Sequence, residues 1–238
     1  METLTIDTPV GKFVTNRPGR ARIFENLGID YCCGGQRSLK DACVEKRLDP
    51  ASVLGDLLCE AEGPGASSGP DWTTAPLTDL ADHIVETHHA YLRRELPRLS
   101  GLLEKVAGTH GKAHPELREL VGIFETFAAE LGSHMMKEEQ ILFPAIRQIE
   151  TTENHERFHC GSIQGPVGAM MHEHDQARDG LHQMRQLTDG FKAPNNACAS
   201  YCTLFDSLAE LETDMHAHIH KENNILFPRA LETEKTGG

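Results

Sequence analysis

The sequence predicts an all-α protein, in which a small N-terminal helical domain precedes an antiparallel four-helix bundle. Apolar residues recur at helical spacing through long C-terminal stretches, and no stretch alternates convincingly with period two. A twelve-residue pattern also occurs twice, as HMMKEEQILFPA from His134 and as HIHKENNILFPR from His218. Four amphipathic helices of about 20 to 30 residues each are sufficient for such a bundle.

The chain divides at a segment rich in Gly, Pro and Ser. EGPGASSGPDW, from Glu62 to Trp72, lacks apolar periodicity and is typical of a flexible linker. We therefore expect a helical domain with a CCGG motif at residues 1–61, a linker at 62–74 and the bundle at 75–232.

Three helices are expected in the N-terminal domain. GRARIFENLG should end at Gly28, which suits a left-handed cap. Ser38, followed by Asp41, should cap LKDACVEKRL. Asp49 and Pro50 should open ASVLGDLLCEA.

The four bundle helices follow from the apolar periodicity and from capping residues. Thr78 is expected to cap the first helix, and Pro97 to kink or break it. Each Leu-Phe-Pro, at 142–144 and at 226–228, is expected to end its helix. The four helices are placed at residues 79–108, 115–143, 166–189 and 196–227.

The repeated pattern predicts a metal site. Residues four apart lie on one face of a helix, so His134 with Glu138, and His218 with Glu222, can each hold a metal ion. One further histidine precedes each pair, 45 and 44 residues earlier respectively. The set of nitrogen and oxygen ligands suits iron or manganese. The six candidate ligands are His89, His134, Glu138, His174, His218 and Glu222.

Several neighbours of these ligands leave alternatives open. His88 competes with His89 for one ligand position, although the apolar stripe through Val85 and Leu92 favours His89. Glu130 and Glu173 are either exposed acids or groups that orient a ligand and carry protons or cations. The residues flanking the two glutamates also differ, as Lys-Glu-Glu at 137–139 against Lys-Glu-Asn at 221–223.

The motif DYCCGG is the second candidate site. Cys32 and Cys33 are adjacent and do not readily form a relaxed disulfide with each other. They precede a helix N-terminus, whose dipole favours a thiolate. The pair is either buried in a tight turn or active in redox chemistry or iron transfer.

The composition of the chain excludes some classes of binding partner and indicates its location. The net charge of −13 argues against a general nucleic-acid binder or a binder of anionic membranes. The chain lacks the run of about 18 apolar residues that a membrane helix requires, and METLTIDTPVGKFV does not resemble a signal peptide. Seven cysteines without a tight framework fit a reduced compartment, so a cytoplasmic location is expected.

GIDYCCGG, followed by two His-x-x-x-Glu motifs that precede Leu-Phe-Pro, resembles the repair-of-iron-centres family of di-iron proteins, which repair iron–sulfur clusters. The resemblance covers about residues 5 to 232 and implies a hemerythrin-like bundle. It implies two non-haem iron ions with an oxo or hydroxo bridge, held by the six candidate ligands, with both glutamates bridging. It also implies that the cysteine pair contributes to repairing clusters damaged by nitric oxide or oxidants.

Three functions follow as hypotheses. The first is supply of iron to damaged iron–sulfur proteins, the second is reduction of nitric oxide at the di-iron site, and the third is dioxygen binding or sensing. The sequence leaves open whether the protein is an enzyme, and a homodimer is compatible with each hypothesis.

Overall fold

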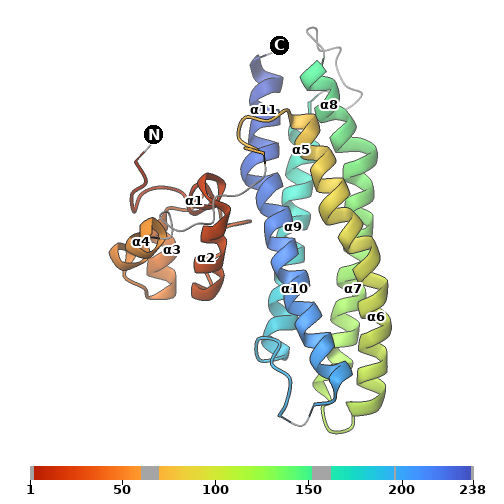
Figure 1. Ribbon diagram of the computed structural model, residues 1–238. Helices are drawn as coiled ribbons and strands as arrows, with labels where there is room; N and C mark the ends of the chain where they lie inside the picture. Colours follow the sequence, from red (N-terminus) through yellow and green to blue (C-terminus); the bar gives the residue numbers. More distant parts are fainter. Residues whose placement is uncertain (1–2, 60–69, 152–161, 196, 237–238) are drawn as a thin grey trace.

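The computed structural model describes residues 3–59, 70–151, 162–195 and 197–236. Figure 1 shows a small N-terminal unit lying beside a long bundle of helices. The regular elements of these described residues are helical, apart from one isolated β-bridge between Pro9 and Ser38. The all-α fold class is thus confirmed, whereas residues 62–69 of the expected linker lie outside the described residues.

The N-terminal unit confirms the three predicted helix boundaries. Gly28 has a φ of 65° and caps the second helix, and the Ser38 side chain accepts a hydrogen bond from the Asp41 N–H. The Asp49 carboxylate accepts from two backbone N–H groups at the start of the last helix. The first helix was not predicted. The elements are α1 (Val10–Asn16), η1 (Pro18–Arg20), α2 (Ala21–Leu27), α3 (Leu39–Lys46) and α4 (Pro50–Cys59).

The bundle consists of four long helical segments, three of which contain a turn of π-helix. In the bundle, α7 packs against α6 and α9, and α10 packs against α6. The first segment is α5 (Leu77–Ile84), η3 (Val85–His89) and α6 (Ala90–His110). The second is α7 (Glu116–Lys137), η4 (Glu138–Leu142) and α8 (Phe143–Thr151). The third is α9 (Gln164–Leu187), and the fourth is α10 (Ala199–Lys221), η5 (Glu222–Leu226) and α11 (Phe227–Thr236).

The prediction that each Leu-Phe-Pro ends its helix is wrong. Helical structure continues past Pro144 to Thr151 and past Pro228 to Thr236. A π turn lies directly before each Phe-Pro. Such a turn is wider than an α turn, which accommodates a proline that lacks a backbone N–H donor.

Two further points about the first segment are corrected. Helix α6 runs through Pro97, so of the two predicted effects of this proline the break is wrong. Thr78 is not the cap of α5, because that helix already begins at Leu77. The Glu150 carboxylate instead accepts hydrogen bonds from the backbone N–H groups of Leu77 and Thr78, at 2.6 and 2.8 Å. A side chain distant in the sequence thus satisfies the free donors of this helix.

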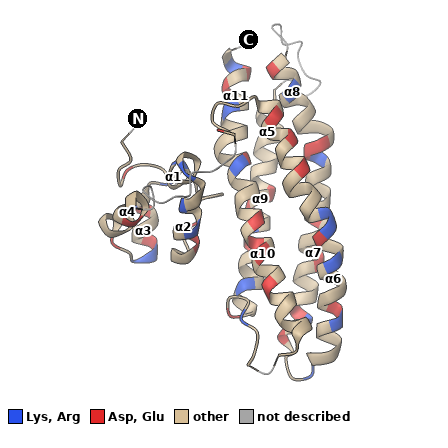
Figure 2. Ribbon diagram, viewed as in Figure 1, with Lys and Arg blue, Asp and Glu red and all other residues tan. Residues whose placement is uncertain are grey.

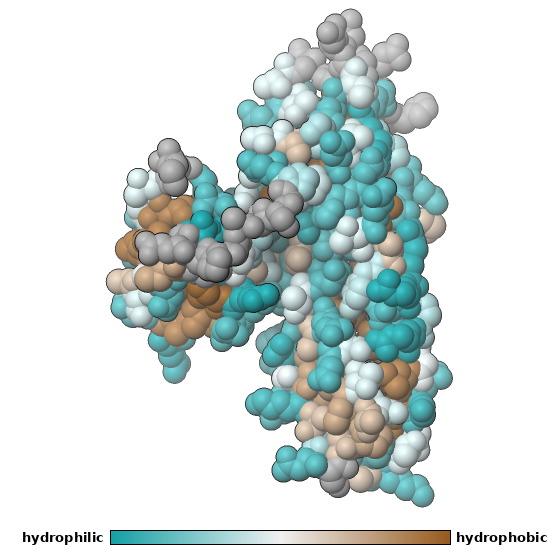
Figure 3. All heavy atoms as spheres, in the orientation of Figure 1, coloured by the Kyte–Doolittle hydropathy of each residue, from teal (hydrophilic) through white to brown (hydrophobic). Residues whose placement is uncertain are grey.

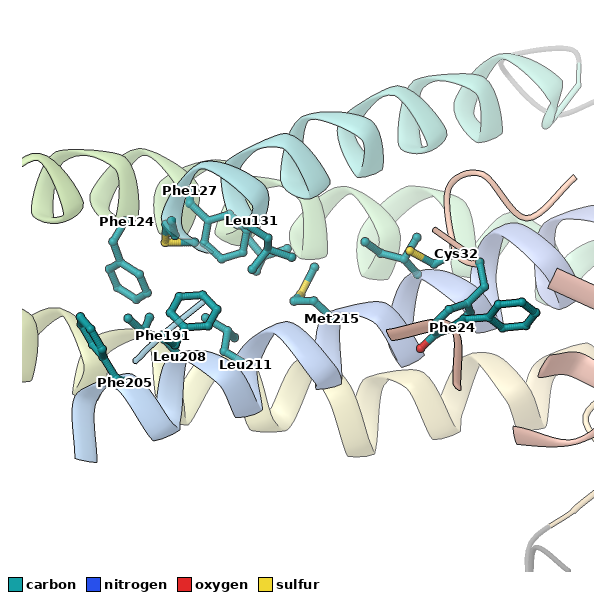
Figure 4. Packing of buried hydrophobic residues seen from close by; sticks show 14 of the residues in the cluster. Phe24, Cys32, Phe124, Phe127, Leu131, Phe191, Phe205, Leu208, Leu211 and Met215 are labelled. Carbon is teal, nitrogen blue, oxygen red and sulfur yellow. The ribbon is translucent and has the colours of Figure 1, made fainter. Parts of the chain in front are cut away.

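The core forms two hydrophobic clusters. The larger one joins the lower bundle to the N-terminal unit, and the smaller one surrounds the Phe-Pro turns and α5. Figure 4 shows Phe124 and Leu131 of α7 opposite Leu208 and Met215 of α10, with Cys32 toward the other end of the same cluster. The apolar contacts therefore fix the cysteine loop against the bundle.

The surface shown in Figure 3 is largely hydrophilic, with apolar atoms gathered on parts of the N-terminal unit and the lower bundle. In Figure 2 acidic and basic residues are interspersed along the bundle helices. Among the described helices, none is long and apolar enough to cross a membrane.

Candidate metal centre

The π turns bring the predicted ligands together. His89 ends the first π turn, whereas Glu138 and Glu222 begin the second and third. A π turn rotates the following residues relative to an α-helix and is often found at functional sites. These turns could not be predicted from the sequence, because apolar spacing barely distinguishes an α turn from a single π turn.

The six candidate ligands form two groups that share both glutamates. His89 and His218 face Glu138 and Glu222 on one side, and His134 and His174 face the same carboxylates on the other. Within each group the possible ligand atoms lie within 4.8 Å of one another. Two carboxylates common to two pairs of imidazoles suit two ions bridged by carboxylate.

The polar atoms of this cluster fit a metal better than they fit one another. Both oxygens of Glu138, Oε2 of Glu222 and Nε2 of His89 are buried without a hydrogen bond of regular geometry, although imidazole nitrogens lie 3.1–3.3 Å from Oε2 of each glutamate. Neither glutamate is exposed to solvent. Two buried carboxylates in one cluster are costly unless positive charge lies between them. Bound cations would satisfy these atoms and neutralise the pair.

Electrostatics within the cluster keep the carboxylates ionised. Burial opposes ionisation of Glu222, but His218 and His174 outweigh it and hold the pKa of Glu222 well below its usual range. Burial likewise opposes protonation of His134, but the carboxylates of Glu138 and Glu222 raise the pKa of His134 to about 9. A metal ion would displace that proton and take its place between the same groups.

In three of the four candidate ligand histidines, His89, His134 and His174, the Nδ1 atom lies within hydrogen-bond distance of a neighbouring side chain. His89 Nδ1 lies 2.6 Å from Glu139 Oε1, and His174 Nδ1 lies 2.9 Å from Asn223 Oδ1. Glu139 and Asn223 each follow a shared glutamate directly, so the two bonds are equivalent in the repeat. Such contacts fix the tautomer and the orientation of a ligand imidazole. The flanking differences between the two copies therefore give the two histidines different partners.

Glu173 contacts a candidate ligand histidine, whereas Glu130 does so in none of the recorded hydrogen bonds. Glu173 Oε2 lies 2.9 Å from His134 Nδ1, and Glu173 Oε1 accepts from Lys137 Nζ at 2.5 Å. Glu130 is exposed and touches no ligand by a hydrogen bond that the structure records. It lines, with His134, Lys137, Glu173 and His174, a hollow of about 150 Å³. This hollow lies at the His134–His174 side of the centre.

The geometry favours His89 over His88 as the candidate ligand. His89 points into the cluster, whereas His88 stacks on the His218 ring with centroids 5.2 Å apart. His88 Nδ1 lies 2.8 Å from Asp214, and Lys221 Nζ lies 2.7 Å from His88 Nε2. Burial lowers the pKa of His88 to about 4, against the opposing hydrogen bond with Asp214. A neutral His88 can donate to Asp214 and accept from Lys221 at once.

The cysteine loop docks beside this centre. Cys33 Sγ lies 3.6 Å from the backbone carbonyl oxygen of His174. Asn224 Nδ2 donates to the carbonyls of Cys32 and Tyr31, at 2.9 and 3.3 Å. Sequence reasoning had no signal for this contact, because it joins segments 192 residues apart.

The expectation of a favoured thiolate at Cys32 is wrong. Its hydrogen bond with the Cys33 side chain and its burial raise the pKa of the Cys32 thiol. The loop shields this sulfur from solvent, and the adjacent Asp30 carboxylate adds negative charge. Helix α3 begins only at Leu39, so its dipole does not offset these effects, and desolvation adds to the disfavouring of the thiolate.

The bundle and its buried His/Glu cluster define a hemerythrin-like class of protein. The sequence profile described as the hemerythrin HHE cation binding domain matches residues 80–230. A second profile, ScdA_N, described as a domain of unknown function, matches residues 6–60. The bundle and the N-terminal unit thus each correspond to a recognised sequence family.

Relatives resemble both parts together. Proteins named iron–sulfur cluster repair protein YtfE from Enterobacter sp. (strain 638) and from Escherichia coli O157:H7 are each 36% identical over 228 residues, which cover 96% of this chain and 98% of the relative. The protein of the same name from Citrobacter koseri is 35% identical over the same coverage. The chain belongs to the family of iron–sulfur cluster repair proteins that combine these two domains.

Proposed function

We propose that this chain is a non-haem di-iron protein that repairs iron–sulfur clusters damaged by nitric oxide or oxidants, and that it does so by supplying iron. The observation that carries the proposal is the pair of buried glutamates shared by two histidine pairs. The ligands would be His89 and His218 on one side, His134 and His174 on the other. The names of the relatives support repair as the cellular role.

The donor set supports iron as the metal. Imidazole and carboxylate ligands without a thiolate suit iron in a helical bundle. Bound iron would supply the ion that a damaged cluster has lost. Four imidazoles and two carboxylates leave coordination positions unfilled, which favours release of an ion over permanent retention.

The chain offers groups for the path between the centre and solvent. Glu173 holds His134 and touches Lys137, and Glu130 lines the same hollow. We assign these two acids to cation or proton passage. We assign Cys32 and Cys33, at the edge of the centre, to transfer of iron or to redox chemistry with a damaged client.

The test compares supply with simple availability of iron. An iron–sulfur enzyme inactivated with nitric oxide is incubated with iron-loaded protein or with free ferrous iron at the same concentration. We expect the protein to restore activity in the presence of a chelator that intercepts free iron. His134→Ala and His218→Ala should lose this effect together with bound iron. Restoration by free iron but not by the loaded protein would refute the proposal.

A second candidate function is reduction of nitric oxide at the same centre. The hollow beside His134 and His174 supports it, because a small molecule could approach the open side. Gas analysis decides between the functions. Nitrous oxide formed over many turnovers by the reduced protein would favour the reductase, and its absence would exclude it.

The proposed partners are damaged iron–sulfur proteins in the cytoplasm, with nitric oxide or dioxygen as small molecules that reach the centre. Fractionation of the native cells, followed by crosslinking to iron–sulfur enzymes after nitric oxide stress, tests both assignments. Recovery of the chain outside the cytoplasm would contradict the first. The crosslinked species also reports whether the chain forms a homodimer.

A further inference from the structure

The loop at residues 30–35 contains a second set of possible metal ligands, apart from the six residues of the bundle. The Asp30 carboxylate and the Cys32 and Cys33 sulfurs offer ligand atoms that lie within 4.8 Å of one another. Cys32 is buried and Cys33 is half-buried, so the sulfurs are held rather than displayed. We propose that Asp30, Cys32 and Cys33 form a separate binding site for one divalent transition-metal ion.

The local backbone shapes this site. Asp30 Oδ1 accepts hydrogen bonds from the N–H groups of Cys32 and Cys33, at 3.0 and 2.9 Å. These bonds turn the loop so that both sulfurs return toward the carboxylate. A Cβ at Gly34 would lie 2.9 Å from the Asp30 carbonyl oxygen and 3.3 Å from its carboxylate. The glycine therefore permits the close approach that brings three ligands together.

Charge and access favour a cation at this position. Cys32 Sγ lies 3.3 Å from Asp30 Oδ1, and Arg178 Nη1 lies 3.7 Å from Asp30 Oδ2. A divalent ion with two thiolates and a carboxylate carries one net negative charge, and Arg178, which also pairs with Asp175 and Asp179 at 2.9 Å, lies near enough to reduce it. Asp30, Cys32 and Gly34 line a groove of about 1010 Å³ between the N-terminal unit and the bundle. Cys32 is only 2% exposed, so the half-buried Asp30 and Cys33 are the ligands that an ion would meet first.

Binding has a defined proton balance. Each thiol loses its proton when its sulfur coordinates the ion, so two protons pass to solvent for each ion bound. No electron is transferred. Two thiolates select softer ions than the nitrogen and oxygen donors of the bundle do, with ferrous iron and zinc as the fitting classes. That ferrous iron is the ion held in the cell rests on the proposed function, whereas the site itself does not.

The position of the site indicates its use. Cys33 Sγ lies 3.6 Å from the carbonyl oxygen of His174, whose ring belongs to the bundle cluster. An ion bound by the loop would therefore lie beside the bundle cluster, at the edge of the groove. The contact places a thiol-containing site next to the helix that carries His174, and the two sites differ in the softness of their donors.

The test uses Cd²⁺ as the probe on full-length protein whose bundle centre has first been loaded with iron. Thiolate coordination gives a charge-transfer absorption in the ultraviolet that imidazole and carboxylate ligands do not give. We expect this absorption to saturate at one ion per chain, with two protons released. It should be absent in Cys32→Ser and in Cys33→Ser, and unchanged in the matched control Cys198→Ser.

Asp30→Asn separates the carboxylate from the loop geometry, because the amide oxygen can still accept the same backbone N–H bonds. This variant should keep the absorption and lose tenfold or more in apparent affinity for Cd²⁺. Unchanged affinity would show that Asp30 is not a ligand and would overturn the three-residue site. Absorption that survives Cys32→Ser would overturn it too.

Alkylation makes the test independent of folding in the variants. In the unsubstituted protein, stoichiometric Cd²⁺ should slow iodoacetamide labelling of Cys32 and Cys33 at least tenfold, as read by peptide mass spectrometry. Labelling of Cys198 should stay unchanged. Equal labelling of the pair with and without Cd²⁺ would refute the proposal, while leaving repair by the bundle centre untouched because no client enters this experiment.

Discussion

Asn224 joins the two parts of the molecule through a hydrogen bond from its Nδ2 to the backbone carbonyl oxygen of Cys32, 2.9 Å away. The same residue lies two positions after the shared Glu222, in the π turn η5. Asn223, between them, holds His174. Three consecutive residues thus belong to the His/Glu cluster, hold one of its candidate ligands and hold the cysteine loop, in that order.

Replacement of Asn224 should loosen the cysteine loop. Asn224→Ala removes both hydrogen bonds from Nδ2 to the loop carbonyls. We expect iodoacetamide to label Cys32 at least about tenfold faster. That factor corresponds to about 1.4 kcal/mol in the equilibrium between the closed and the open loop. Gln36→Ala is the control, because Gln36 is exposed and meets the Asn224 side chain only through a long hydrogen bond of 3.5 Å, without reaching the loop carbonyls in the bonds recorded for the described residues. Equal labelling in the Asn224 variant and in the parent would show that the Asn224 hydrogen bonds do not hold the loop.

Gly35 should not tolerate a side chain. A Cβ there would lie 2.2 Å from Asn224 Oδ1 and 2.7 Å from the Tyr31 carbonyl oxygen. We expect Gly35→Ala to lower the free energy of unfolding by about 1–3 kcal/mol, as overpacking does. Gly101→Ala is the matched control, since nothing lies within 4 Å of its Cβ and it sits inside α6. The control should gain about 1 kcal/mol from helix propensity. Urea unfolding measures both, and a stabilised Gly35 variant would contradict the expected clash.

Glu139 should strengthen metal binding without touching the metal. Its Oε1 lies 2.6 Å from His89 Nδ1, and it also pairs with Arg93. Glu139→Ala should weaken iron binding by about 10–100-fold, the usual effect of losing a residue that orients a ligand. Competition with a chelator of known affinity measures the change. Gln140→Ala, at the exposed next position, should bind iron as the parent does.

Glu150 should stabilise the bundle in a pH-dependent manner. Burial opposes ionisation of this carboxyl group, but the backbone N–H groups of Thr78 and Leu77 outweigh it and lower the pKa of Glu150. Its stabilising effect is therefore complete above the ordinary glutamate pKa and is lost as the pH falls through the lowered value. Glu150→Gln should cost about 0.5–2 kcal/mol of unfolding free energy at pH 7, by analogy with helix caps.

The difference between Glu150→Gln and the parent should disappear in acid. Denaturant unfolding at pH 7 and at a pH below the lowered value of Glu150 measures it. Gln148→Ala serves as the control, because Gln148 is exposed on the same helix. A difference of equal size at both pH values would show that the carboxylate charge is not the cause.

The helical framework and the approximate composition of the centre could be predicted because both depend on local spacing. His134 with Glu138, and its copy in α10 and η5, follow from the one-turn relation of positions four apart. The N-terminal caps at Ser38 and Asp49 depend on contacts within three residues, which a sequence displays directly. These are the features that the structure reproduces.

Long-range contacts could not be predicted in this way. Glu150 displaces Thr78 as the cap of α5 because a carboxylate 73 positions away reaches the same donors. The raised pKa of Cys32 depends first on its hydrogen bond with the Cys33 side chain and then on burial, and neither is visible in the sequence. The repeat indicated that Glu139 and Asn223 occupy equivalent positions. That these two side chains point toward His89 and His174 could not be predicted, because it depends on the π turns.

The hollow beside His134 and His174 should make the two halves of the proposed di-iron centre exchange their ions at different rates. That half borders open space, whereas His218 in the other half lies under the His88 ring, which Asp214 and Lys221 hold in place. Two ions bound by nearly identical ligands should therefore exchange with isotopically labelled iron in two phases. The fast phase should account for one ion per chain. Such a protein would contain one ion during part of its cycle. The ion beside His218 would then keep the six candidate ligands in place until a second ion binds beside His134 and His174.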